Sequence, residues 1–468
     1  MFKEQATFEY MLLAFTYVVG VCAIILVVLG LGMVDSGLVR RRNVVHTWVQ
    51  KLVATFIAGG GLMLGGYAFW QWQFNQAFGV PDPLRQAIQD WWIGGVFSNT
   101  PATGIDPAVL PEADVLQVFV PFFATFAMAT MALIHSGVVE RIRSGPLYAM
   151  SFVVGAILSP LAGYLCWGSL SPLTNRGVHD YDGVFPLYIF AGTFALVLAW
   201  RLKPRLGVFE PHPSGARPFA HAPGLVAIGV LLILFAKPII SIGSGYILPG
   251  EGYFGISMTS SGIGLVMMNW ACAVFAGGVV GGVIAHRQKN ATYAFLGPIT
   301  GLVICGALFD VGRPWECLVL GGFGPIVALG TTALMRRLRI DESKAVPLAL
   351  GPGIVGAIAT GFFAWGEKTG GYPGLEGEFG FQHAEITPWW QLVGVVAIVL
   401  LAGVPALLMA LFFERFGGGL RISEEEEIAG QDSVLWSVPA EEESSPATSG
   451  GVPAGVGGRV GTAPDVTV

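Results

Sequence analysis

Charged side chains are scarce in this sequence. Only 12% of its 468 residues are Asp, Glu, Lys or Arg, whereas soluble globular domains contain about a quarter. Hydrophobic residues make up 53%, and the 66 glycines suit helices that pack closely in lipid. This composition excludes a soluble globular protein, and the net charge of −6 argues against a nucleic-acid partner. It indicates an integral membrane protein that crosses the bilayer several times.

The motifs of metal sites and of common enzyme classes are also missing. The five cysteines are scattered, and no C-x-x-C pair suggests a zinc site or a disulfide framework. No H-E-x-x-H, P-loop or nucleophile-elbow sequence occurs. We therefore expect a protein that is not an enzyme and that holds neither a metal nor a cofactor.

Long apolar runs, in contrast, are abundant. Eleven of them approach the ~20 residues that a helix needs to cross a bilayer. They cover residues 9–34, 47–70, 115–138, 146–170, 185–202, 224–246, 257–284, 291–310, 317–335, 346–366 and 389–413. We predict an all-α integral membrane protein with eleven transmembrane helices.

Basic residues follow every odd-numbered run and are rare after the even-numbered ones. The clusters are RRRN, ERIR, RLKPR, HRQK and RRLR, and Arg415 and Arg421 follow the last run. Because basic loops stay in the cytoplasm, we expect a short external N-terminus (1–8) and a cytosolic C-terminal segment (415–436) at the cell membrane. Residues 437–468 are rich in Gly, Pro, Ser and Ala, which predicts a disordered tail.

An odd number of runs suggests two inverted halves of five helices followed by one more helix. The halves would cover about 9–202 and 224–366, and the last helix 389–413, in a membrane domain of 9–414. A weak internal echo supports this arrangement, because DYDG and IDES place Asp180 and Asp341 at the start of the fifth and tenth helices. Aspartate at a helix N-terminus commonly caps the helix, so a structural role explains both residues equally well.

Several stretches resemble one family of membrane transporters. They are SGLVRRRNVV, GVVERIR, CWGSL, HDYDG, MMNWACAVFAGG, GPGIVGAIATGFFA and GLRISEEEEIAG. Their order and spacing along residues 9–430 are similar to those of the ammonium transporter (Amt/Rh/Mep) family. The resemblance implies a homotrimer in the lipid bilayer. Each subunit would hold one narrow apolar pore between two inverted halves, and ammonium or ammonia would be the substrate.

The resemblance also implies roles for individual residues. Trp167, Phe126 and Ser244 match an outer vestibule that recruits ammonium. Phe126 matches one of two stacked gate phenylalanines, but Ile240 occupies the second gate position, so the aromatic stack is incomplete. Positions that match structural or pore-supporting residues of the family are Asp180, Asp341 and Asn269.

The main departure concerns two facing pore histidines that mark the family. They should lie eight residues after each of the two aspartates, where this chain has Tyr188 and Ala349. The seven histidines are His46, His135, His179, His212, His221, His286 and His383. All but one lie in loops or at the ends of runs, so no two are expected to pair in mid-membrane.

Lys237 and Asp35 are charges inside apolar runs, which is costly and usually marks a cavity or a partner. The helical rise places Lys237 at about the height of Tyr188, roughly 20 Å from the inner ends of their helices. The resemblance places Lys237 at a pore-lining position, and Asp35 near the inner half of the pore. The alternative is a structural ion pair of Lys237 with Asp35, about 12 Å away along the axis, or with another carboxylate. Tyr188 could instead be a core tyrosine, and Asp35 could bond locally.

The protonation of Lys237 would decide its effect. A charged Lys237 would oppose an ammonium ion, whereas a neutral one could accept its proton.

Three functions remain open at this point. The first is a channel or transporter for ammonium or ammonia with an atypical Tyr188–Lys237 midpore. The second is the same fold with a different small solute. The third is a non-conducting ammonium sensor or regulatory subunit. In the family the C-terminal segment contacts PII-type signalling proteins, but this chain departs from the pattern after EEEEIAGQD, which makes that partner uncertain.

Overall fold

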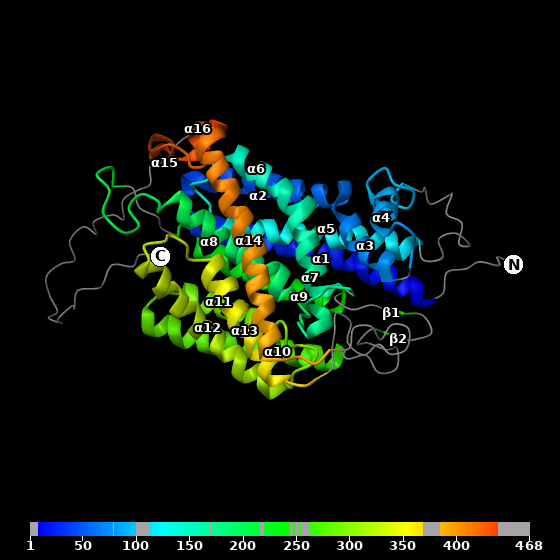
Figure 1. The fold of residues 1–468 in the computed structure, drawn as a ribbon. Helices are drawn as coiled ribbons and strands as arrows, with labels where there is room; N and C mark the ends of the chain where they lie inside the picture. The colour runs from blue at the N-terminus through cyan, green and yellow to red at the C-terminus, as the bar shows by residue number, and fades with distance from the viewer. Residues whose placement is uncertain are drawn as a thin grey trace.

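The computed structural model describes residues 8–77, 79–99, 113–168, 170–215, 220–243, 247–248, 252–253, 263–367 and 384–438. These residues form one bundle of long helices, with a hairpin of two-residue strands, β1 (Ile247–Leu248) and β2 (Gly252–Tyr253) (Figure 1). Ten helical spans in the described ranges are long and apolar enough to cross a membrane. The run expected at 291–310 forms a shorter helix, α11 (Thr292–Cys305). The predicted all-helical membrane fold is therefore confirmed.

The first half of the chain contains eight α-helices and several short helical turns. They are α1 (Phe8–Leu38), η1 (Arg41–Asn43), α2 (Val44–Gly61), η2 (Leu62–Gly66), α3 (Tyr67–Ala77), α4 (Pro83–Trp91), α5 (Ala113–Ser136), α6 (Ser144–Val153), η4 (Val154–Leu158), α7 (Ser159–Trp167), η5 (Thr174–Arg176), η6 (Val184–Ile189) and α8 (Phe190–Leu202).

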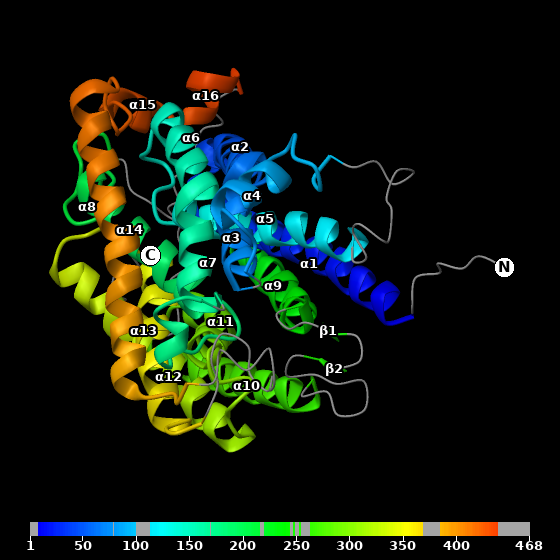
Figure 2. The same ribbon diagram turned by 45° about the vertical axis from the view of Figure 1, so that its right-hand side comes forward.

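The second half continues with α9 (Pro223–Gly243), α10 (Ile263–Gln288), α11, α12 (Pro314–Arg337), η7 (Val346–Leu350), α13 (Gly351–Phe363), α14 (Pro388–Phe416), α15 (Glu424–Ala429) and α16 (Gln431–Trp436). Helix α1 lies along α9, the first helix of this half (Figure 2). Their backbones touch at Gly30, where an added Cβ would lie 2.6 Å from the carbonyl oxygen of Gly229.

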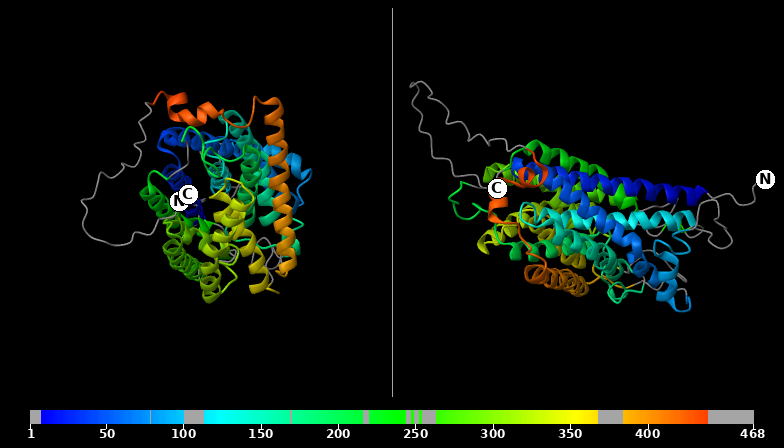
Figure 3. Two further views of the ribbon diagram at one scale, coloured as in Figure 1. Left: turned by 90° about the vertical axis from the view of Figure 1, so that its left-hand side faces the viewer. Right: turned by 90° about the horizontal axis from the view of Figure 1, so that it is seen from above.

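The two ends of the bundle are distinct. We call basal the end that carries residues 40–43, 202–210 and 417–438, and apical the opposite end, which carries residues 167–182. Figure 3 shows the start of α1 and the helices α15 and α16 at opposite ends. The C-terminal segment docks on the basal end, where Asp432 accepts the backbone N–H of His46 at 2.8 Å and Arg42 donates to Ile428 O at 2.7 Å. A chain that crosses the membrane an odd number of times has its two termini on opposite sides, as observed for α1 and the C-terminal segment in Figure 3.

The expected echo between the halves is present, but one residue differs. Each half contains a π-helical turn, η6 or η7, that begins after a buried carboxylate. Asp180 accepts the backbone N–H groups of Gly183, Val184 and Phe185 at 3.2, 2.9 and 3.1 Å.

In the second half Glu342 has the capping role that we had considered for Asp341. Glu342 accepts the backbone N–H groups of residues 344–346 at 2.9, 2.7 and 2.6 Å. Asp341 is paired instead with Arg205 at 2.8 Å and with Arg141 at 3.3 Å. The capping interpretation of Asp341 was wrong because Glu342 lies four residues before η7, as Asp180 lies four residues before η6, and Glu342 therefore occupies the helix end.

The predicted terminal segments lie largely outside the described residues. Of the predicted external segment 1–8, residues 1–7 lie outside the described residues. Of the predicted tail 437–468, residues 439–468 lie outside them.

Helices α10, α11 and α12 approach each other closely through glycines, which gives a first prediction. A Cβ at Gly281 would lie 2.5 Å from Tyr293 O and 2.8 Å from the Cα of Gly297, whereas one at Gly282 would meet nothing within 4 Å. Gly281→Ala is therefore expected to destabilise the protein by about 1–3 kcal/mol, because backbone must move. Thermal unfolding in detergent measures this, with Gly282→Ala as the matched control. Equal melting temperatures for the two variants would contradict the packing described.

Candidate functional site

A small cavity lies in the middle of the bundle, between α1, α5, η6, α9 and α11. Its volume is about 50 Å³, and its lining is apolar except for Tyr188 and Lys237. Phe126 and Ile240 also line it. The structure therefore brings together four residues that the sequence had assigned to a gate and a midpoint.

Lys237 has a carboxylate partner inside this region. Its Nζ lies 2.7 Å from Oδ2 of Asp182, and the exposed fractions of the two side chains are 5% and 0%. The ammonium group also lies 5.5 Å from the centroid of the Tyr188 ring, within the range of a cation–π contact. Ser241, one helical turn after Lys237, donates to Oδ1 of Asp182 at 3.2 Å. The partner is thus Asp182, and the Asp35 alternative is wrong.

The loop HDYDG is held firmly enough to place Asp182 there. Gly183 follows it with φ of 84°, a left-handed conformation that glycine adopts without strain. Tyr181 donates its hydroxyl to Ser241 O at 2.7 Å, and His179 Nε2 lies 3.0 Å from Oδ1 of Asp310. The backbone N–H of His179 also donates to Gln391 at 2.9 Å. Contacts from both halves of the chain therefore fix this loop.

Asp180, in the same loop, supports the start of η6. Burial raises the pKa of its carboxyl to about 6, because the backbone N–H groups that it accepts offset only part of the lost hydration. Its side chain points to the helix end and is not among the lining residues of the cavity in the described part of the chain. This geometry fits a supporting role.

Two of the expected vestibule residues, Trp167 and Phe126, lie on the apical side of the cavity. The rings of Trp167 and Phe126 meet edge to face, with centroids 5.6 Å apart and planes at 74°. Both also border a void of about 10 Å³, which they share with Thr130 and Leu187. Phe126 therefore separates the Trp167 side from the Lys237 side. Ser244 lies outside the described residues.

The count that assigned the second histidine position to Ala349 is off by one residue. Because Glu342 and not Asp341 caps η7, the residue that corresponds to Tyr188, the fifth of η6, is Leu350, the fifth of η7. Ala349 is buried in η7, and the lining of the cavity in the described ranges does not include it. The backbone of α13 passes close by, since a Cβ at Gly353 would lie 3.7 Å from Cβ of Tyr188. η7 and the start of α13 therefore place no titratable side chain at the position where the resemblance predicts the second histidine.

Asp35 lies nearer the basal end, in a charge cluster of its own. Its Oδ1 lies 2.6 Å from Nζ of Lys344, and its Oδ2 lies 2.8 Å from Nζ of Lys51. Ser136 donates its hydroxyl to the same carboxylate at 2.7 Å, and His135 Nδ1 lies 3.9 Å away. Asp35 therefore does not line the central cavity.

Three of these partners were missed from the sequence. Lys51 stands inside the run 47–70, so it was as visible as Lys237. Lys344 and Asp182 flank runs and resemble ordinary loop charges, and only the fold shows that both reach buried partners.

Asn269 has a structural position. Its amide donates to the carbonyl oxygens of Phe309 and Gly312, both at 2.8 Å, and so fixes the turn after α11. That turn carries Asp310, the partner of His179.

Comparisons with known proteins agree on one family. The model of the Ammonium Transporter Family matches residues 15–438. Ammonium transporter Amt2 of Methanocaldococcus jannaschii is 28% identical over 421 residues, which cover 88% of this chain and 87% of the relative. The ammonium transporter of Bacillus subtilis is 25% identical over 418 residues, with 89% and 95% covered.

Solved structures share the fold. A structure named Sensor Amt Protein aligns with a TM-score of 0.72 at 21% identity and covers 91% of this chain and 98% of its own. Mep2 of Candida albicans aligns with a TM-score of 0.66 at 19% identity, with 91% and 88% covered. Since the family match covers nearly the whole described chain, this multi-pass membrane protein belongs to the ammonium transporter family.

Proposed function

We propose that this protein carries ammonium or ammonia across the cell membrane, along a path that passes Trp167, Phe126 and the Tyr188–Lys237 cavity. The observation that carries the proposal is the placement of Phe126, Ile240, Tyr188 and Lys237 around one cavity in a chain of this family. The relatives above are named as ammonium transporters. Transport, not catalysis, is the activity that this supports.

The proposed orientation has the apical end outside and the basal end in the cytoplasm. The basal end carries the basic clusters at 40–42 and 201–205, together with Arg143 and Arg421, as expected for cytoplasmic loops. We place the protein in the plasma membrane as a homotrimer, as the family resemblance implies. A PII-type regulator would have to bind the docked segment 417–438, whose exposed residues include Val434, Leu435 and Trp436.

The ion pair determines which form of the substrate can pass. A lysine within 2.7 Å of a buried carboxylate is held in its charged form, so it already carries the proton that a neutral lysine would accept. The pair has no net charge, but Lys237 lines the cavity and Asp182 is not among its lining residues, so the cation is the nearer charge and opposes an ammonium ion there. We therefore propose that the neutral form crosses the Lys237 region, with its proton left on the outer side.

The second prediction tests transport itself. Purified protein in proteoliposomes should raise the internal pH when ammonium is added outside, because ammonia that enters takes up a proton, and the accompanying current should be small. A stopped-flow pH dye and a solid-supported-membrane electrode measure the two signals. An intact oligomer that gives neither signal would contradict ammonium conduction.

The third prediction concerns the Lys237–Asp182 pair. Lys237→Met leaves Asp182 buried without its cation and should cost about 3–5 kcal/mol in unfolding free energy. The double variant Lys237→Met/Asp182→Asn removes both charges, so it should be more stable than the single variant. It should also raise ammonium-evoked current about tenfold, because the fixed cation is gone.

The control for this cycle is the pair Arg201–Glu414, whose side chains are both 29% exposed. Its double replacement by Met and Gln should change stability by less than about 1 kcal/mol and leave the current unchanged. A double variant at Lys237 and Asp182 that folds but conducts no more current than the natural protein would overturn the barrier role.

One observation favours a second candidate, a non-conducting ammonium sensor. An ion pair spans the path between α9 and the loop before η6, as it would in a closed pore. Ammonium binding in the absence of any flux, measured by calorimetry on the detergent-purified protein, would favour this candidate. A pH response to another small amine but not to ammonium would favour a different solute.

A further inference from the structure

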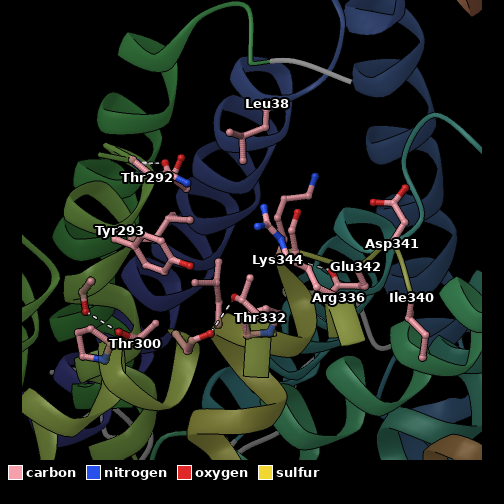
Figure 4. Close-up of a pocket in the computed structure, with 18 of the residues that line it drawn as sticks. Leu38, Thr292, Tyr293, Thr300, Thr332, Arg336, Ile340, Asp341, Glu342 and Lys344 are labelled. Carbon is pink, nitrogen blue, oxygen red and sulfur yellow. Dashed lines mark hydrogen bonds between the residues drawn. The ribbon is translucent and has the colours of Figure 1, made fainter. Parts of the chain in front are cut away.

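A second and larger cavity opens at the basal end. Its volume is about 250 Å³, and it lies between the end of α1, α11, α12 and the segment before η7. Figure 4 shows Thr292 and Tyr293 of α11 on one side of it and Glu342 and Lys344 on the other, with Leu38 of α1 at one end.

The two cavities lie one after the other along the same helices. On α1, Leu31 lines the central cavity and Leu38 lines the basal one, seven residues or about 10 Å apart. On α11, Ile299 lines the central cavity and Thr300 the basal one. A solute that leaves the central cavity toward the basal end would therefore have only a short barrier to cross.

Asp35 is located at this barrier. It stands four residues after Leu31 and three before Leu38, so all three lie on one face of α1. The two carboxylate oxygens of Asp35 are paired with Lys51 and Lys344, and the two lysines have different surroundings. Lys51 is fully buried and also donates to Ala132 O at 2.8 Å and to Ser136 Oγ at 3.2 Å. Lys344 lines the basal cavity, and its side chain is 10% exposed.

This asymmetry makes only Lys344 free to move. The basal cavity provides space for its flexible side chain, and Asp35 would keep Lys51 as a partner if Lys344 left. The nearby Glu342 accepts three backbone N–H groups at the start of η7, so it is fixed as a helix cap. The ammonium group of Lys344 is thus the charge that a solute would meet between the cavities.

We propose that Lys344, docked on Asp35, is a second, inner specificity-determining residue of the pathway. It closes the passage between the two cavities and disfavours cations there, and its swing into the basal cavity opens the passage to a neutral solute. Lys51 keeps the charge of Asp35 balanced during the swing. This inference rests on the proposed function, since it assigns a second selectivity point to the same path.

The test compares Lys344→Cys with Lys51→Cys. Each variant leaves the other lysine on Asp35, so both should fold. The variants are made in the Lys237→Met/Asp182→Asn background, so that the outer pair does not limit the current. Lys344→Cys should raise ammonium-evoked current about tenfold over that background. Lys51→Cys should lower the current, because Lys344 is then the remaining lysine on Asp35 and its departure would leave a buried carboxylate unpaired.

Chemical modification of the Lys344→Cys variant distinguishes an effect of the positive charge at position 344 from an effect of side-chain size. Aminoethyl methanethiosulfonate, added from the basal side, should modify Cys at position 344 and restore a lysine-like ammonium, which should return the current to the background value. The uncharged methyl reagent should modify the same position without lowering the current. At position 51 neither reagent should react. Peptide mass spectrometry resolves each site from the native cysteines.

The outcomes separate this inference from the proposed function. Equal current increases in the two variants, or modification at position 51 but not at 344, would overturn the role of Lys344 while ammonium transport stands. Modification at 344 with no ammonium response in any variant would overturn the inner selectivity role together with the proposed function.

Discussion

Lipid does not solvate charge, so every ionised side chain inside the bundle must find an opposite charge before the helices can pack. Two of the clusters that meet this requirement lie along the proposed path, and they link distant parts of the chain. Lys237 of α9 is joined to the loop before η6, and Asp35 of α1 is joined to α2 and to the segment before η7. Removing one member of a buried pair costs several kcal/mol, whereas the pair itself contributes little net stability. The main effect of these buried ion pairs is therefore to determine which segments of the chain contact each other and at what height in the bundle.

This constraint explains what the sequence could predict. Helices are determined by hydrophobic length, so ten long spans and the shorter α11 fall where the apolar runs lie. The basic clusters at 40–42 and 201–205 lie at one end of the bundle, as their alternation predicts. The approach of Phe126 to Trp167 and of Tyr188 to Lys237 also agrees with the residues singled out by the resemblance.

Partner choice could not be predicted in the same way. Asp182 and Lys237 are 55 positions apart in the sequence, and nothing in this spacing indicates contact. The meeting depends on the left-handed Gly183 and on the anchoring of Tyr181 and His179, which are properties of the folded loop. The rise per residue of a helix predicts only the height of a side chain along the axis. It therefore could not exclude Asp35 as the partner of Lys237, although Asp35 is paired with Lys51 and Lys344. The same limit applies to the helix cap. Asp341 and Glu342 are adjacent in the sequence, and only the start of η7, four residues after Glu342, shows which carboxylate caps it.

The two clusters differ in a way that bears on transport. At Lys237 one cation faces one carboxylate, with a tyrosine ring beside it and a cavity of about 50 Å³ below. At Asp35 one carboxylate faces two cations, so one of them can leave while the charge of Asp35 stays compensated. In the proposed path, a fixed cation at the midpoint and a mobile one at the basal end would disfavour charged ammonium twice, yet they would present little barrier to a small neutral molecule. Such a path would not need facing imidazoles to exclude cations, which agrees with a tyrosine and an apolar residue at the two positions where the resemblance expects histidines.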